Sequence, residues 1–245
     1  MIGVEREALV LCSKTRRVVP KAHLILKELR RYVKLGWFGT ELSACQIESK
    51  TPPCSSLSKL RKYLERQAAL VRWAAAKHGL VVVYVDVAPV GIPLSVAKDP
   101  AGRYQRIARM LGPQRLRAAC RTLGLHVHVG LPDHASALRV YNAMVPRVET
   151  YVRLGDRSGG ERLRLYRQVQ PDATPRQLGS WDELYSFAVL NGFAHNPRDW
   201  WWLLRLTCYG SIENRCAGSL PTVDAVMVYV AQFLADCKKE MEDAH

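Results

Sequence analysis

The chain has 245 residues, 48% of them hydrophobic, which is enough for a well-buried core in one domain spanning residues 1–245. Its 36 Lys and Arg against 22 Asp and Glu give a net charge of +14, which would suit an anionic partner or the solvated faces of amphipathic helices. No window approaches the roughly 20 apolar residues of a membrane span. Seven cysteines without a C-x-x-C pair argue against a disulfide framework and a structural zinc site. We therefore expect a soluble, cytoplasmic protein without a membrane partner.

The first third of the chain predicts two strands separated by a helix. Residues 2–11 alternate between apolar and polar side chains, as in a half-buried strand. A long amphipathic helix follows, begun by Ser55 or Ser56 and stopped by Gly79. Residues 80–87 form a strongly β-forming run and predict a further strand.

The middle of the chain predicts a loop, an interrupted helix, another strand and another helix. Residues 88–102 are rich in turn formers and predict a long loop. A helix from about Tyr104 should be interrupted at Pro113, because proline cannot donate a helical hydrogen bond. Residues 122–131 alternate as a strand, and Asp133 is placed to cap the helix that follows.

The last part of the chain combines irregular and helical patterns. Residues 153–179 mix glycine, proline and charge and predict a mobile loop. Ser180 and Glu183 form a capping box that opens a helix. Residues 196–218 are expected to be extended, and a last helix should begin near Pro221. Because strands and helices do not alternate regularly, the sequence predicts an α+β fold with a largely antiparallel sheet.

Several of the predicted strands carry carboxylates on one face. Glu5 and Glu7 are two residues apart, so both side chains project to the same side of the first strand. Two like charges this close are unfavourable unless a cation lies between them. Glu48 precedes a proline turn, and Glu213 shares a strand face with Arg215. The plainer alternatives are an exposed strand face, a surface acid and a simple ion pair.

Two imidazoles share one face of the strand at 122–131. His126 and His128 alternate with apolar residues and are flanked by glycines. Magnesium favours carboxylate oxygens and substrate phosphates, and a histidine can complete such a set. These segments together favour a metal–phosphate site on the open face of a sheet, although histidines satisfied within a core remain an alternative.

In this order, the segments resemble the family of carboxylate–amine ligases related to glutamate–cysteine ligase, of the bacterial and plant type. The resemblance covers almost the whole chain, and each motif is weak alone. The motifs are G-V-E-R-E at 3–7, Q-I-E-S-K-T-P at 46–52, R-Y at 103–104, G-L-H-V-H-V-G at 124–130, W-W-L-L-R at 201–205 and S-I-E-N-R at 211–215. The resemblance implies a curved, mainly antiparallel sheet packed by helices, like the catalytic domain of glutamine synthetase, here as a short form of a single ligase domain.

The resemblance also implies roles for individual residues. Magnesium would be held by the residues that match the family's metal ligands, which are Glu5, Glu7, Glu48, His126 and Glu213. His128 would lie near the nucleotide phosphates. Arg205 would contact the ATP phosphates, and Arg103 is a further candidate for the same cleft. Arg215 would meet the transferred phosphoryl group or the substrate carboxylate, so Arg215 and Arg205 are the expected catalytic residues.

The implied reaction uses ATP and Mg²⁺ to form an amide bond. ATP would phosphorylate a carboxylate, and an amine would then displace phosphate from the acyl phosphate. The substrates stay open, because the stretch that would define the acid pocket offers only loose matches at Ser158, Arg162 and Arg167. Amino acids, a peptide or the end of a carrier protein are all compatible, and the positive charge also suits an acidic macromolecular substrate. A homo-oligomer is compatible as well.

Two functions of other classes remain alternatives. An H-x-H pair also occurs in metal-dependent hydrolases, in which imidazoles and carboxylates hold zinc and activate water. The acids outnumber the histidines here, and a barrel of alternating strands and helices is not indicated. The other alternative is a basic nucleic-acid-binding protein with a degenerate ligase site, which predicts binding that weakens steeply with salt.

Overall fold

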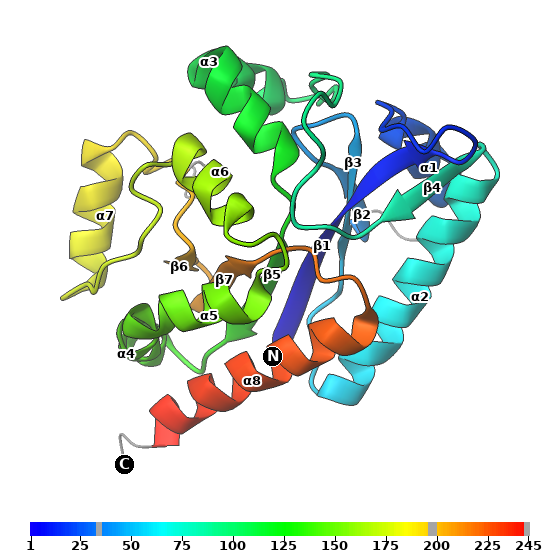
Figure 1. Cartoon of the computed structure of the whole chain (residues 1–245). Coiled ribbons are helices and arrows are strands. Elements are labelled where there is room, and N and C mark those ends of the chain that lie inside the picture. Colours follow the sequence, from blue (N-terminus) through cyan, green and yellow to red (C-terminus); the bar gives the residue numbers. More distant parts are fainter. Residues whose placement is uncertain (33–35, 196–199, 243–245) are drawn as a thin grey trace.

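One antiparallel sheet organises the computed structural model, which describes residues 1–32, 36–195 and 200–242 (Figure 1). Among these residues seven strands pair in the order β2-β3-β1-β5-β7-β6, and β4 also pairs with β1. All the pairings are antiparallel. The strands are β1 (Ile2–Cys12), β2 (Phe38–Thr40), β3 (Gln46–Lys50), β4 (Leu80–Val83), β5 (Leu125–Gly130), β6 (Leu204–Leu206) and β7 (Ser211–Ala217). The predicted α+β class is therefore confirmed.

Three of the described helices begin at the capping residues that the sequence predicts. Ser56, Asp133 and Ser180 each accept a backbone hydrogen bond from the third residue of the helix that follows. The helices are α1 (Ala22–Leu29), α2 (Leu57–Ala76), α3 (Arg103–Arg121), α4 (His134–Met144), α5 (Val148–Gly155), α6 (Glu161–Val169), α7 (Trp181–Leu190) and α8 (Val223–Glu242), with a short 3-10 turn at Val145–Arg147. The predicted interruption of α3 is confirmed and centres on Gly112, whose φ is 67°.

The two faces of the sheet differ in what covers them. Val4, Val127 and Ile212 are buried on one face, in a core to which α2, α4, α5 and α8 contribute. Leu9 lies on the other face, the one that carries Glu5 and Glu7, and packs in the same cluster as α3. Helix α3 in turn packs against α6. Residues of both helices line the same cavity as Glu5 and Glu7.

Two predictions of local structure were wrong. The strand expected at 80–87 ends at Val83, because the next residues bond outside the ladder: Asp86 accepts from the backbone N–H groups of Leu123 and Arg157. The loop expected at 153–179 contains the end of α5 and all of α6. The glycines and charged residues of this stretch favoured a loop, although the spacing of Leu165, Tyr166 and Val169, which α6 buries, is helical.

The segment predicted to be extended, residues 196–218, is described in part. Residues 196–199 of the predicted extended segment lie outside the described residues, and the remainder contains β6 and β7. None of the described helices is both long enough and apolar enough to span a bilayer.

Candidate active site

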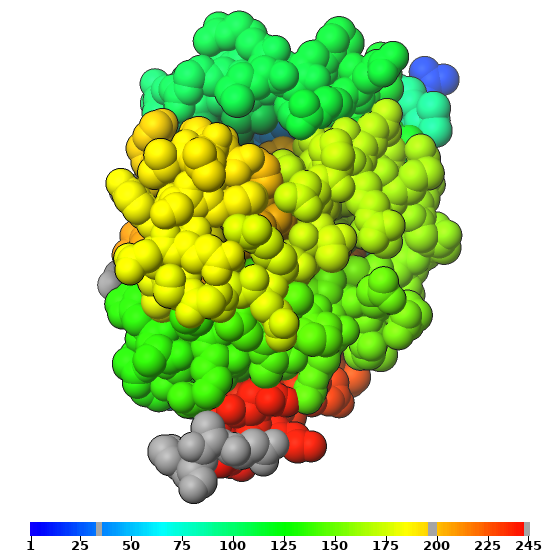
Figure 2. All heavy atoms as spheres, turned by 90° about the vertical axis from the view of Figure 1, so that its left-hand side faces the viewer, coloured from blue at the N-terminus to red at the C-terminus, as the bar shows by residue number. Residues whose placement is uncertain are grey.

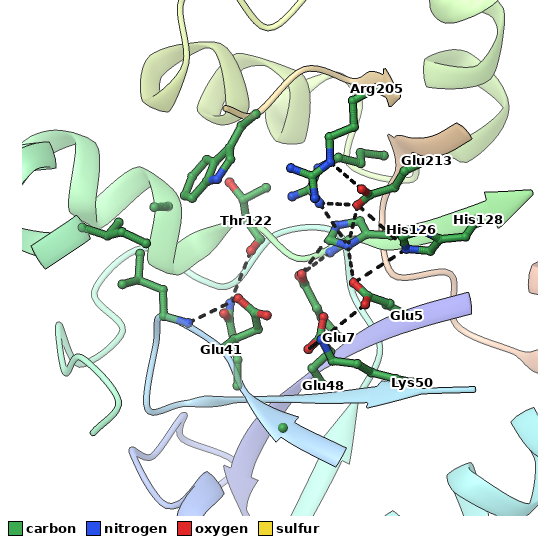
Figure 3. A pocket seen from close by; sticks show the side chains of 18 of the residues that line it. Glu5, Glu7, Glu41, Glu48, Lys50, Thr122, His126, His128, Arg205 and Glu213 are labelled. Carbon is green, nitrogen blue, oxygen red and sulfur yellow. Dashed lines mark hydrogen bonds and ion pairs between the residues drawn. The ribbon is translucent and has the colours of Figure 1, made fainter. Parts of the chain in front are cut away.

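Antiparallel register brings the charged residues of five strands into neighbouring positions on one face. Because side chains alternate along each strand, residues that are paired across a ladder point to the same side of the sheet. The pairs are Glu5 with Lys50, Glu7 with Glu48, Glu5 with His126, His128 with Glu213 and Arg205 with Glu213. A continuous row of acids, imidazoles and cations thus crosses the sheet from β3 to β6 (Figure 3).

This row forms the floor of a cavity of about 670 Å³. Helices α3 and α6 and residues 201–209 supply its walls. Figure 2 shows the molecule hollowed between α3 at the top and the segments of α6 and α7 below it. The lining includes all the residues to which the resemblance gives a role, which are Glu5, Glu7, Glu48, Arg103, His126, His128, Arg205, Glu213 and Arg215. Of the three loose matches for the acid pocket, Arg162 lines the cavity, whereas Ser158 and Arg167 do not.

His126 lies at the centre of the row. Its Nδ1 is 3.3 Å from Glu5 Oε2, and its Nε2 is 3.7 Å from Glu7 Oε1. Burial and the nearby Arg215 guanidinium lower the pKa of His126 to about 4. The imidazole is therefore neutral at pH 7, which is the form that binds a metal ion.

Glu213 is held between two arginines. Arg205 donates from Nε to Glu213 Oε2, and Arg215 Nη1 donates to Glu213 Oε1 at 2.6 Å. Burial alone would raise the pKa of Glu213, which is only 1% exposed, but the two guanidinium groups hold it well below its usual range. Glu213 is therefore ionised. Because its charge is buried, another cation would have to replace either arginine that turned from Glu213 to a bound anion.

Arg215 and Arg162 are fixed by different partners. Arg215 Nε donates to the Tyr166 hydroxyl at 3.1 Å, and its Nη1 lies 3.3 Å from His126 Nδ1. Arg162 instead donates to three backbone carbonyl oxygens, at 2.8–3.0 Å, those of Leu123, Cys216 and Arg215. Arg162, which the sequence offered only as a loose match, thus fastens α6 to the sheet at the cavity wall.

A second group of acids lies on the β3 side of the row. Burial and the charge of Glu41 raise the pKa of Glu7 to about 8. Burial, with Glu41 and Glu5 nearby, raises the pKa of Glu48 well above its usual range. In contrast, the pKa of Glu5 is low, because the His126 hydrogen bond and the Lys50 charge outweigh the effect of burial. Burial and the neighbouring acids therefore favour the protonated forms of Glu7 and Glu48 when no metal ion is bound.

Sequence reasoning missed two residues on the β3 side of the row, one acid and one lysine. Glu41 follows the three-residue strand β2 and shows no alternation that would mark it. Lys50 is two residues from Glu48 on β3, so the spacing of E-S-K could have placed its ammonium on the same face.

The donor set fits a divalent cation. Among the described residues there are three groups in which the ligand atoms lie within 4.8 Å of one another: Glu5–His128–Glu213, Glu5–Glu48–His126 and Glu7–Glu41–Glu48. The Nε2 atom of His128 is buried and finds no hydrogen-bond partner among the described residues. Carboxylate oxygens in the majority, completed by imidazole nitrogen, match magnesium or manganese better than zinc.

Comparison with known proteins places the chain in a family. Residues 1–152 match the model of glutamate-cysteine ligase family 2 (GCS2). The chain belongs to this family of ligases. Across 98% of its length it is 26% identical to a protein of Rubrobacter xylanophilus with the provisional name glutamate–cysteine ligase 2-3, and across 94% it is 27% identical to a glutamate–cysteine ligase 2, also provisionally named, of Paracoccus denitrificans. The chain spans 70% and 64% of these GCS2 relatives, and 32% of a third, from Rhodococcus jostii.

Solved structures share the fold of this GCS2 chain. A bifunctional glutathione synthetase from Pasteurella multocida superposes with a TM-score of 0.63 at 14% identity, over 98% of this chain and 40% of that one. Plasmodium falciparum glutamine synthetase gives a TM-score of 0.52 at 10% identity, over 100% of this chain and 52% of that one. The expected glutamine synthetase-like fold is therefore confirmed.

Proposed function

We propose that the chain, acting as one catalytic domain over residues 1–245, joins a carboxylate to an amine in an ATP- and magnesium-dependent reaction. The observation that carries the proposal is the row of three overlapping ligand groups on the cavity floor, with Arg205 and Arg215 beside it. Membership of GCS2 and the shared fold support the same reaction class.

The residues of the row would form two ion sites, and arginines beside them would contact the ATP phosphates. Glu5, His128 and Glu213 would hold a divalent ion on the side of Arg205, and Glu7, Glu41 and Glu48 would hold another on the opposite side. Bound ions would neutralise the charge of the ATP phosphates. Arg205 would orient these phosphates, with Arg103 on the cavity wall as a further contact. Phosphoryl transfer depends mainly on such positioning and charge stabilisation, so no protein nucleophile is needed.

Both chemical steps balance without further reactants. The substrate carboxylate oxygen attacks the γ-phosphorus of ATP, the bond to ADP breaks, and an acyl phosphate forms. The amine nitrogen then attacks the acyl carbon, phosphate leaves, and the nitrogen loses a proton to give the amide. Arg215 would contact the transferring phosphoryl group, because its guanidinium is fixed by Tyr166 and Glu213 at the centre of the cavity wall.

The substrates of this proposal are an amino acid or peptide carboxylate and an amine. An acidic macromolecule is also proposed as the acid, because α3 at the cavity rim has six arginines and no acidic residue. Arg109 and Arg117 are exposed there and have no ion-pair partner among the described residues. Turnover of an acidic peptide should then weaken steeply as salt is raised, whereas turnover of single amino acids should not.

The test is ATP-to-ADP turnover with magnesium and pools of amino acids and acidic peptides. We expect turnover that requires both an acid and an amine, and a loss of about 100-fold or more in Glu5→Gln and His128→Ala, which each remove a ligand from the same proposed ion site. Glu149→Gln, which changes an exposed acid on α5, is the matched control and should behave as the wild type. Hydrolysis without ATP, or equal activity in all variants, would contradict the proposal.

A further inference from the structure

Lys50 places a positive charge inside the row of carboxylates. It lies on β3 directly opposite Glu5 of β1 and two residues after Glu48, so all three side chains share one face. Its Nζ atom is 2.6 Å from Glu48 Oε2 and 3.2 Å from Glu5 Oε1 (Figure 3). The ammonium therefore bridges acids from two neighbouring strands.

The two acids that Lys50 bridges are the shared members of the three ligand groups. Glu5 belongs to the group with His128 and to the middle group, and Glu48 belongs to the middle group and to the group with Glu7. The middle group, Glu5–Glu48–His126, is the one that contains both partners of Lys50. Because Lys50 Nζ contacts one oxygen of each of these two acids, an ammonium and a divalent ion in the middle group would lie close together and repel each other.

We infer that Lys50 is a built-in cation that occupies the middle ligand group, so that the chain binds divalent ions at the two outer groups and not at all three. The inference rests on the proposed function, because it assumes that the cavity holds divalent ions. It assigns Lys50 as a positioning residue, which bridges Glu5 and Glu48 through one oxygen of each and leaves their remaining oxygens for the outer ions.

The surroundings of Lys50 keep it in this place. Its backbone N–H donates to the Trp37 carbonyl oxygen at 2.8 Å, and its carbonyl oxygen accepts from Gln67 Nε2 at 2.6 Å. Both main-chain bonds hold the β3 end of the side chain, so its ammonium stays within reach of Glu5 and Glu48.

A fixed ammonium differs from a third metal ion in its consequences. It contributes one positive charge instead of two, and it is present whatever the concentration of free metal. It also offers hydrogen-bond donors, so it fixes the two carboxylates but cannot coordinate a phosphate oxygen in the way that a metal ion does. The central acids would therefore keep their positions before any ion binds.

The experiment is a titration of the metal-free protein with Mn²⁺, in which the electron paramagnetic resonance signal of free Mn²⁺ gives the number bound per chain. We expect two bound ions in the wild type and three in Lys50→Met, which removes the charge but keeps the length of the side chain. Lys50→Arg should retain two. Lys62→Met, on the exposed face of α2, is the control and should also retain two.

Each other result would overturn the inference. Three ions in the wild type would mean that Lys50 leaves the group when metal enters, and two ions in Lys50→Met would mean that the middle group does not bind metal. If Lys50→Met fails to fold by circular dichroism, Lys50→Gln gives the same count with a polar side chain. Failure of the proposed function is distinguishable, because it is read separately as the absence of ATP turnover that requires an acid and an amine, whatever number of Mn²⁺ ions the wild type and the variants bind.

Discussion

Arg215 and Glu213 form an ion pair of 2.6 Å in which the carboxylate is almost completely buried. The two residues lie two positions apart on β7, and both face the cavity. Burial of both charged groups costs desolvation free energy. The further bonds to Arg205, Tyr166 and His126 compensate for this cost. The ion pair should therefore contribute both to the stability of the fold and to the proposed reaction.

Removal of one member should expose this cost. Arg215→Met leaves the Glu213 charge buried with a single arginine, so the free energy of unfolding should fall by about 3–5 kcal/mol. ATP turnover should be lost in the same variant. Urea denaturation measures the first effect, and Arg215→Lys should restore most of the stability but little of the turnover. A change in unfolding free energy below about 1 kcal/mol would show that the pair is replaceable.

Tyr166 should affect turnover more than stability. Tyr166→Phe removes only the hydroxyl that accepts from Arg215 Nε, so the guanidinium loses one of its fixed partners. We expect kcat to fall by about tenfold, the loss of one hydrogen bond to a charged group, with KM for ATP nearly unchanged. An equal fall in Tyr141→Phe, whose hydroxyl donates to the distant Arg176 carbonyl oxygen, would contradict a specific role.

Metal affinity should rise with pH. The pKa of Glu7 is about 8, raised by burial and by Glu41, so in the metal-free protein Glu7 carries a proton below pH 8. A divalent ion must displace this proton, and its affinity should therefore fall by up to roughly tenfold for each pH unit below 8. The rise in Tm at a fixed, subsaturating Mg²⁺ concentration should be larger at pH 8.5 than at pH 6.5. In Glu7→Gln the difference between the two pH values should become smaller.

The same proton gives the metal-free protein the opposite trend. Because the pKa of Glu7 is raised above its unfolded value, protonation stabilises the folded state, and this contribution is lost as the pH rises towards 8. Thermal unfolding in the presence of a chelator should therefore show a lower Tm at pH 8.5 than at pH 6.5. A Tm that rises over this range without metal would contradict the raised pKa.

A close approach between α5 and β7 should tolerate no extra atom. A Cβ on Gly155 would lie 2.5 Å from the Cα of Ala217, whose strand carries Glu213 and Arg215. Gly155→Ala should therefore lower the free energy of unfolding by about 1–3 kcal/mol. Gly130→Ala is the control, since the nearest atom to its Cβ would be 3.7 Å away and its backbone is extended. Equal unfolding free energies for the two variants would be evidence against tight packing here.

The sequence predicts which segments of the site are strands better than it predicts which residues pair across neighbouring strands. The alternation around Glu5 and Glu7, and around His126 and His128, indicates which side chains share a face, because the strand period is two. It does not indicate that Glu7 lies opposite Glu48, since register depends on the whole sheet. Glu41 has no local pattern at all, and only tertiary packing brings it to the other acids. Helix α6 was missed because the turn-forming residues around it outweighed its three buried apolar positions.

The strands that build the site differ greatly in length. β1 has 11 residues and neighbours on both sides, whereas β2 and β6, at the two ends of the order, have three each. Short terminal strands open more easily than central ones, so backbone amides should exchange with deuterium fastest near Thr40 and Arg205 and slowest near Glu5. The middle of the molecule would then keep the reacting groups in register, while its two margins adjust to the size and shape of whatever enters.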